Sequence, residues 1–356
     1  MSQTLEAGVA PPPASPDERV ARRSALARLL TRPEVGALLG AIVIYLVFFS
    51  VAPPFRDVNS LATILYVSST YGIPTVAVAL LMIGGEFDLS AGVAVTASAL
   101  FASMFAFQFS TNMWVGVALS LVFALVVGFI NGYLVVKTGI PSFLVTLGTF
   151  FMLRGLNLAI TKQVTGNVGT DDVSNIQGFD SARKVFASSF SLGGVNIRIT
   201  VVWWIVFVAI ATWVLLRTHL GNWIFATGGD LNAARNVGVP VERVKIALFI
   251  YTACAATLLA TIQVMEAGSA DTTRGLLKEF EAIIAAVIGG VLLTGGYGTV
   301  YGVLFGALIF GLVQMGIFYT GIDTDWFKVF LGIVILVAVL VNNYIRLKAL
   351  GRGGGK

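Results

Sequence analysis

The chain has 356 residues, of which 57% are hydrophobic and only 12% are charged. A soluble protein of this size could not bury so many apolar side chains, so the composition excludes a soluble globular domain and indicates a polytopic membrane protein. One Cys and one His exclude a disulfide framework and a His/Cys zinc site. The positive residues behind the net charge of +5 collect in particular loops, which indicates membrane orientation and not affinity for nucleic acid.

The first 34 residues are polar, rich in Pro and then in Arg, and we expect them to form a disordered basic tail. The first apolar run, Val35–Ala52, has 18 residues and is long enough to cross a bilayer. Because a long polar segment precedes it and further spans follow, a retained anchor is favoured over a cleaved signal peptide.

Nine more apolar runs follow the first one. The ten predicted spans are 35–52, 61–83, 89–109, 114–136, 140–161, 199–216, 245–265, 281–293, 299–319 and 327–344. The run at 281–293 is short for a span, so we expect it to start earlier or to be broken. The predicted fold class is therefore an all-α polytopic membrane protein of about ten transmembrane helices over residues 35–345, some of them short or broken.

The distribution of basic residues predicts the orientation of the chain. With the amino terminus inside, the cytoplasmic side holds 14 of the 23 Lys and Arg residues and the outer side holds 8, Lys278 among them, while Arg154 lies within a span. This bias predicts that both termini, including the basic tail 346–356, are cytoplasmic. Arg154 is about seven residues, or roughly 10 Å, from the outer end of its span. It is interpreted as a side chain that snorkels outward or forms an internal pair; the alternative is that its planar group binds sugar hydroxyls or a carboxylate.

Two loops are long enough to have functions of their own. The predicted external loop, 162–198, is interpreted either as a docking surface for an external partner or as a flexible connection. The predicted cytoplasmic loop, 217–245, holds a short helix that Asp230 caps and Gly238 ends, after which Pro240 opens the next span. A short helix held between two spans is a suitable handle for a soluble partner; the alternative is a solvated loop without a partner.

Two passages that begin Ile-Gly-Gly depart from a plain helical pattern. They start at Ile83 and Ile288, each after an apolar run of small residues, and they run in the same direction in the predicted topology. They are either traces of a parallel repeat or a chance identity in Gly-rich sequence. The first passage also carries Glu86 and Asp88, which are the carboxylates expected closest to the hydrophobic interior.

An ionised carboxylate at the centre of a bilayer costs about 2.5–3.5 kcal/mol on insertion scales, so each of these two should be paired, capped or in water. Asp88 precedes Leu89-Ser90-Ala91, and we expect the next helix to be capped by Asp88 or by Ser90.

Sequence motifs for catalysis are missing. Gly295-Gly296-Tyr297-Gly298 lacks the Lys-Ser/Thr of a P-loop, and there is no Ser/His/Asp set, no HExxH motif and no chain of carboxylates suited to a proton relay. We therefore expect this chain to bind no cofactor or metal, to hydrolyse no ATP by itself and to be poorly suited to proton coupling.

Four stretches resemble the permease subunits of bacterial ABC importers for simple sugars, the ribose/xylose/galactose type. They are IGGEFDLSAGVAV (83–95), IPSFLVTLGTFFMLRG (140–155), GNWIFATGGDLNAARNVGVPVERVK (221–245) and EFEAIIAAVIGGVLLTGGYGTVYGVLFGALI (279–309). With the span pattern they cover about residues 35 to 345. The chain departs from the family at Glu86-Phe87, which precede Asp88 where the family has Gly-Gly-Ile-Asp-Leu-Ser, and at Asn232, where other ABC permeases carry Glu.

The resemblance implies a permease domain at 35–345 in the bacterial cytoplasmic membrane, embedded in lipid and paired with a second permease copy. It implies an ATPase subunit that binds ATP and Mg²⁺, and an extracytoplasmic sugar-binding protein. The residues that the resemblance assigns to ATPase coupling are Asp230, Asn232, Ala233, Ala234, Arg235, Gly238 and Val239. Candidates for the substrate pathway of a monosaccharide or related polyol are Phe87, Asp88, Asn131, Phe143 and Thr146.

Two other classes remain as alternatives. A stand-alone secondary transporter or channel for a small polar solute would work in an ion gradient without an ATPase. An intramembrane enzyme is disfavoured because no catalytic set is present.

Overall fold

The structure is a computed structural model that describes residues 33–333 and 336. The elements in chain order are α2 (Pro33–Val51), a 3₁₀ turn (Pro53–Arg56), α3 (Val58–Ile83), α4 (Ala91–Met104), a π-helical turn (Phe105–Ser110), α5 (Met113–Thr138), α6 (Ser142–Thr165), α7 (Phe179–Phe186), β1 (Ser189–Leu192), β2 (Val195–Arg198), α8 (Ile199–Arg217), α9 (His219–Gly229), α10 (Leu231–Asn236), α11 (Val241–Ala267), α12 (Lys278–Ile288) and α13 (Val300–Thr320). This order confirms the all-α membrane fold, to which one short β-hairpin is added.

Eight helices in this part of the chain are long and apolar enough to cross a membrane, and they confirm eight of the ten predicted spans. The π-helical turn continues α4, so that the two together form one candidate span, Ala91–Ser110. The span predicted at 281–293 is α12, which has only 11 residues and reaches about 16 Å, roughly half of a bilayer core. The span predicted at 327–344 and the tail at 346–356 lie largely or wholly outside the described residues, as does almost all of the tail at 1–34.

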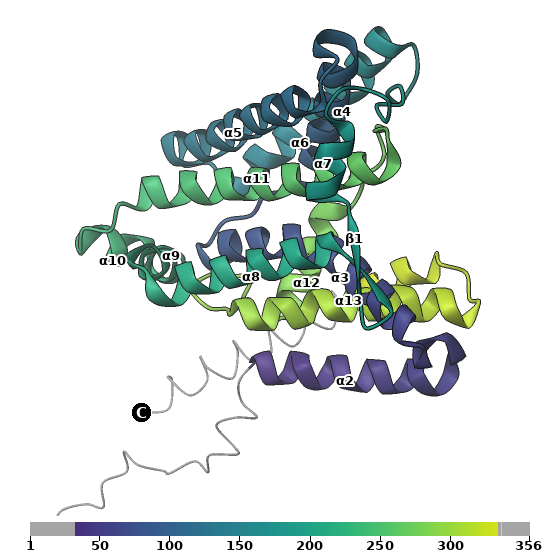
Figure 1. The fold of residues 1–356 in the computed structure, drawn as a ribbon. Coiled ribbons are helices and arrows are strands. Elements are labelled where there is room, and N and C mark those ends of the chain that lie inside the picture. The colour runs from purple at the N-terminus through teal and green to yellow at the C-terminus, as the bar shows by residue number, and fades with distance from the viewer. Residues whose placement is uncertain (1–32, 334–335, 337–356) are drawn as a thin grey trace, which may run out of the picture.

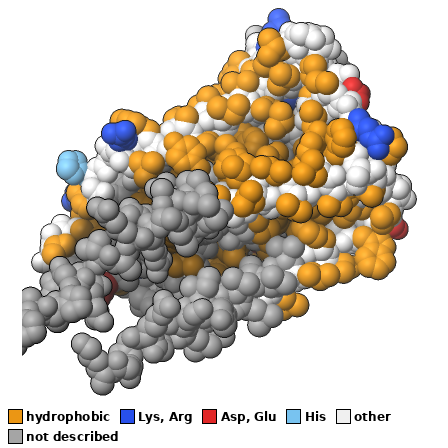
Figure 2. Space-filling view, turned by 90° about the horizontal axis from the view of Figure 1, so that it is seen from below, with side chains coloured by type: hydrophobic (Ala, Val, Ile, Leu, Met, Phe, Trp, Pro, Cys, Tyr) orange, Lys and Arg blue, Asp and Glu red, His pale blue; other side chains and the backbone are white. Residues whose placement is uncertain are grey.

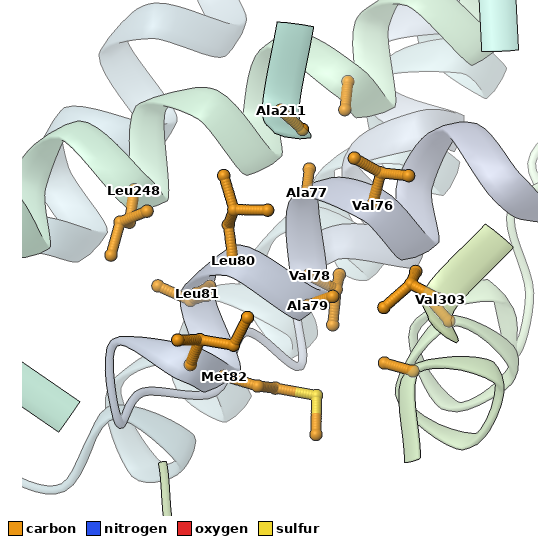
Figure 3. Packing of buried hydrophobic residues seen from close by; sticks show 14 of the residues in the cluster. Val76, Ala77, Val78, Ala79, Leu80, Leu81, Met82, Ala211, Leu248 and Val303 are labelled. Atoms are coloured by element: carbon orange, nitrogen blue, oxygen red, sulfur yellow. The ribbon is translucent and has the colours of Figure 1, made fainter. Parts of the chain in front are cut away.

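The centre of the bundle is α3, in which every residue from Tyr71 to Ile83 is buried. Its last turns pack against Ala211 of α8, Leu248 of α11 and Val303 of α13, all of which are buried in the same cluster (Figure 3). A helix that is apolar on every side is buried on every side, which explains why α3 occupies this position. The peripheral helices α2, α5, α6 and α8 leave many large apolar side chains exposed instead.

The exposed apolar side chains form a surface suited to lipid. Figure 2 shows hydrophobic side chains over much of one face of the molecule, with the charged side chains near its margins. Inside the bundle, helices approach closely at small residues, as is typical of packing in lipid. A Cβ atom on Gly132 of α5 would lie 2.7 Å from the Cα atom of Ile246 in α11, so only glycine permits this contact.

The two long loops lie at opposite ends of the bundle (Figure 1). The predicted external loop, 162–198, is ordered: it contains the end of α6, then α7 and the antiparallel β1–β2 hairpin. Its first part pairs with the α11–α12 connection, since the Thr170 N–H donates to the Ala270 carbonyl at 2.8 Å and the Val173 N–H donates to the Gly268 carbonyl at 2.8 Å. The opposite end carries α9 and α10.

Candidate functional site

The loop at 217–245 contains two helices, of which the sequence predicted one. In α10, the Asp230 carboxylate accepts hydrogen bonds from the Asn232 and Ala233 N–H groups, both at 2.9 Å, which confirms the predicted cap. Gly238, with φ +82°, ends the helix, and Pro240 stands at the N-cap of α11. The helix missed by the prediction is α9, whose Ile224 is buried; apolar Trp223-Ile224-Phe225 in a supposedly solvated loop was the available signal.

The residues assigned to ATPase coupling lie together on and just after α10, but they differ in exposure. Asn232, Ala233, Arg235 and Gly238 are exposed, Val239 is half-buried, and Ala234 is 3% exposed. The small size of Ala234 is therefore required by the packing of its own chain. Val237, which the sequence did not single out, is 78% exposed and is the most accessible apolar side chain on this loop.

The turn between α3 and α4, residues 84–90, brings most of the substrate-pathway candidates together. The Phe87 N–H donates to Ser142 Oγ at 2.9 Å and the Leu89 N–H donates to Thr146 Oγ1 at 3.0 Å, so two hydroxyl groups of α6 hold the backbone of this turn. The Phe143 side chain is exposed on α6 beside them. The turn is thus fixed from the side of α6, although it belongs to no regular element.

Asp88 and Asn131 belong to one buried hydrogen-bond network. Asp88 Oδ1 accepts from the Ser90 N–H at 2.8 Å and from Ser90 Oγ–H at 2.5 Å. Asn131 Nδ2 donates to Ser90 Oγ at 2.9 Å, and Thr149 Oγ1–H donates to Asn131 Oδ1 at 2.6 Å. The expected cap on α4 is absent, because neither the Asp88 nor the Ser90 side chain accepts a hydrogen bond from an N–H group within α4. In this conformation the network joins α4, α5 and α6.

Glu86 is paired, as a carboxylate at this depth requires. Its Oε1 atom forms an ion pair with Lys245 Nζ of α11, and the two side chains are 9% and 14% exposed. The partners are 159 positions apart in the sequence, and Lys245 lies little more than one turn after Pro240. This pair joins the turn at 84–90 to the helix that leaves the α10 loop.

Further charged side chains lie inside the bundle at the start of α12, which corrects the expectation that Glu86 and Asp88 are the innermost carboxylates. Glu279 is 1% exposed, and neither of its carboxylate oxygens has a hydrogen-bond partner among the described residues. Lys278 Nζ pairs with Glu281 at 2.7 Å and lies 4.1 Å from the centroid of the Tyr71 ring, halfway along α3. Because α12 is too short to span, its charged first turn lies in the bundle and not on the outer surface, where Lys278 had been counted.

Arg154 contacts an aromatic ring of its own helix. Its guanidinium carbon lies 5.9 Å from the centroid of the Phe150 ring, one turn closer to the amino-terminal end of α6. The side chain lines a small cavity of about 20 Å³ together with Phe150, Thr96 and Gly275. Within residues 33–333 and 336, no three His, Cys, Asp or Glu side chains are grouped so that they could hold a metal ion.

The described residues contain eight helices of span length, an interrupted segment that interior hydroxyl groups hold, and a helical loop at one end of the bundle. These features define a polytopic membrane protein. Residues 60–339 match the protein family described as "Branched-chain amino acid transport system / permease component". The chain belongs to this family of ABC-importer permeases.

Curated relatives cover most of the chain. The ribose import permease protein RbsC of Escherichia coli K12 is 32% identical over 313 residues, which are 87% of this chain and 94% of the relative. The fructose import permease protein FrcC of Rhizobium meliloti is 30% identical over 307 residues, 86% and 84% of the two chains. The galactose/methyl galactoside import permease protein MglC of Escherichia coli K12 is 32% identical over 321 residues, 85% and 93%. No solved structure matches the chain significantly.

These similarities establish the class of function. The chain is the permease of an ABC importer in the inner membrane, and a permease of this class works with an ATPase and a substrate-binding protein. The relatives are transport subunits and not enzymes in their own right.

Proposed function

We propose that this permease imports a monosaccharide or a related polyol, and that ATP and Mg²⁺ are bound by a separate ATPase subunit. The relatives named for ribose, fructose and galactose support the sugar class over the branched-chain amino acids in the description of the family. The observation that carries the proposal is α10: a capped helix with an exposed apolar end, held between two spans at one end of the bundle.

The ATPase docks on the exposed residues of the α10 loop. Asp230 fixes the first turn of α10 through two hydrogen bonds, and Gly238 and Pro240 fix its exit. Asn232, Ala233 and Arg235 face outward with Val237, while Ala234 and Val239 support the helix from within. A rigid handle transmits a displacement to α9 and α11, and the permease then switches between two states by rigid-body movement.

A second copy of the permease covers the exposed face of α6. Arg154 is exposed on this helix, and within the described part of the chain its guanidinium faces an aromatic ring and pairs with no carboxylate. A cation facing lipid at this depth costs about 2.5–3.5 kcal/mol on insertion scales, so the surroundings of Arg154 should be protein or water. A substrate path between two permease copies supplies both protein and water around Arg154. Phe143, a candidate for the substrate pathway, lies on the same helix, α6.

Uptake into proteoliposomes tests the proposed function. The permease is reconstituted with its ATPase inside and its sugar-binding protein outside, and we expect uptake of a radiolabelled pentose or hexose that requires internal ATP. Leucine and isoleucine serve as control solutes. Uptake driven by a proton or sodium gradient without the ATPase would contradict the proposal and identify a secondary transporter.

The proposed orientation places α10 in the cytoplasm and α7 outside. In a Cys254→Ala background, we expect Asn236→Cys to react with an impermeant maleimide only from the cytoplasmic side and Asp180→Cys only from the outer side. Both positions are exposed, so access across the membrane is the only variable. Labelling of the two positions from the same side would contradict the topology.

A further inference from the structure

Three chain segments that are far apart in the sequence meet backbone to backbone beside α10. They are Ile83–Gly85 at the end of α3, Gly228 near the end of α9, and Gly295–Gly296 in the connection between α12 and α13; we call them the glycine junction. The Gly296 N–H donates to the Ile83 carbonyl at 2.8 Å, which joins the first and third segments directly.

Gly228 lies between the other two segments with no room for a side chain. A Cβ atom placed on Gly228 would lie 1.8 Å from the Ile83 carbonyl oxygen and 2.7 Å from the Gly296 nitrogen. A Cβ atom on Gly295 would lie 2.8 Å from the Gly85 Cα atom. The backbone of Gly229, the next residue, also lies close to Gly296, but a Cβ atom added to Gly229 would meet no atom within 4 Å. A side chain is therefore excluded at Gly228 and not at Gly229.

The two Ile-Gly-Gly passages end their helices in the same way. The Glu86 N–H donates to the Leu81 carbonyl and the Val291 N–H donates to the Ala286 carbonyl, both at 3.1 Å. Gly85 and Gly290 have φ of +85° and +90°, a conformation that favours glycine at a helix end. Both helices stop at this level of the bundle, and the chain after each of them is irregular up to the next helix.

A second link joins the α10 loop to the same place. The Glu86–Lys245 ion pair connects the turn after α3 to α11, which follows α10 in the chain as α9 precedes it. The α10 loop is thus attached to residues 84–90 at both of its ends: through Gly228 before Asp230, and through Lys245 after Pro240.

We propose that the glycine junction and the Glu86–Lys245 pair form the joint through which movement of α10 displaces the two interrupted segments, 84–90 and 289–299. This inference rests on the proposed function. A backbone contact without intervening side chains has no rotamers that could absorb a displacement, and close-packed interiors transmit strain. Displacement of residues 84–90 then reaches α6 through Ser142 and Thr146, and α5 through Ser90 and Asn131. Gly228 and Lys245 are positioning residues, since they act through the turn and not on the solute.

The matched variants Gly228→Ala and Gly229→Ala test the joint. They make the same change in neighbouring residues of α9, but only the first meets backbone atoms. The readouts are ATPase co-purification, ATP hydrolysis, and sugar uptake per ATP hydrolysed in proteoliposomes. For Gly228→Ala we expect co-purification to persist while uptake per ATP falls about tenfold or more, the change that about 1.4 kcal/mol produces. Gly229→Ala should behave as the wild type.

The ion pair supplies a second test, should Gly228→Ala fail to fold. Lys245→Glu should lower uptake per ATP, and the double variant Lys245→Glu with Glu86→Lys should restore much of it. Glu281→Gln is the control, because it breaks a pair of similar burial, Lys278–Glu281, that does not contact the α10 loop. It should lower thermal stability without changing uptake per ATP.

The joint would be refuted if Gly228→Ala kept wild-type uptake per ATP. It would be refuted equally if the charge exchange rescued nothing, or if Glu281→Gln uncoupled transport as strongly as Lys245→Glu does. Failure of the wild-type protein to bind the ATPase or to import sugar would contradict the proposed function instead, so the two failures are distinguishable.

Discussion

Val237→Glu should abolish stable association of the ATPase with the permease. The side chain of Val237 is 78% exposed at the carboxyl end of α10, and we place it at the centre of the docking surface. The loss of a hot-spot side chain at the centre of an interface costs about 2 kcal/mol or more, and a buried unpaired carboxylate adds a desolvation cost. We expect co-purification and binding-protein-stimulated ATP hydrolysis to be lost together, with no change in the amount of permease in the membrane.

The permease itself should tolerate this change. An exposed side chain with few contacts in its own chain typically alters stability by no more than about 0.5 kcal/mol. Val168→Glu is the matched control, since Val168 is 54% exposed on the loop at the opposite end of the bundle. Ala234→Glu is a poor probe, because Ala234 is buried in its own fold and the variant would disturb α10 itself. Normal ATPase binding by Val237→Glu would leave α10 without its proposed role.

Asn131→Leu should produce the largest loss of stability among the predictions. Asn131 is 1% exposed, and its amide joins Ser90 at the start of α4 to Thr149 on α6. Leucine has a similar size but cannot donate to Ser90 Oγ or accept from Thr149 Oγ1. Ser90 Oγ keeps its bond to Asp88 and Thr149 Oγ1 keeps a long bond to the Val145 carbonyl. The variant therefore loses two buried hydrogen bonds, each worth about 0.5–1.5 kcal/mol, and a loss of roughly 1–3 kcal/mol is expected. Thermal unfolding of the detergent-solubilised permease measures it.

Asn157→Leu, on the neighbouring helix α6, controls for the loss of a side-chain amide as such. The Asn157 side chain donates one long hydrogen bond, 3.5 Å to the Val93 carbonyl, so its replacement should cost much less. Asn131→Asp keeps the size and the acceptor oxygen, and it should fall between the wild type and Asn131→Leu. Equal unfolding temperatures for Asn131→Leu and Asn157→Leu would show that the network does not hold the turn at 84–90 in place.

The sequence alone determined the features that follow from local composition. Apolar runs of span length give helices whatever surrounds them in lipid, because every backbone polar group must be satisfied within its own segment. The cap on α10 is equally local: Asp230 bonds the N–H groups two and three residues ahead of it. Both Ile-Gly-Gly passages were also recognisable, since a helix end that needs positive φ favours glycine.

Contacts between distant segments were decided only by the tertiary structure. No local pattern pairs Glu86 with Lys245, and the sequence indicated only that the carboxylate needed a partner. The charged first turn of α12 lies in the bundle because this helix is too short to span the membrane. A count of charges in loops therefore could not place Lys278. The glycine junction forms where the backbones at residues 83, 228 and 296 approach one another. The sequence does not show that glycine is required there, because this depends on the atoms that an added Cβ would meet.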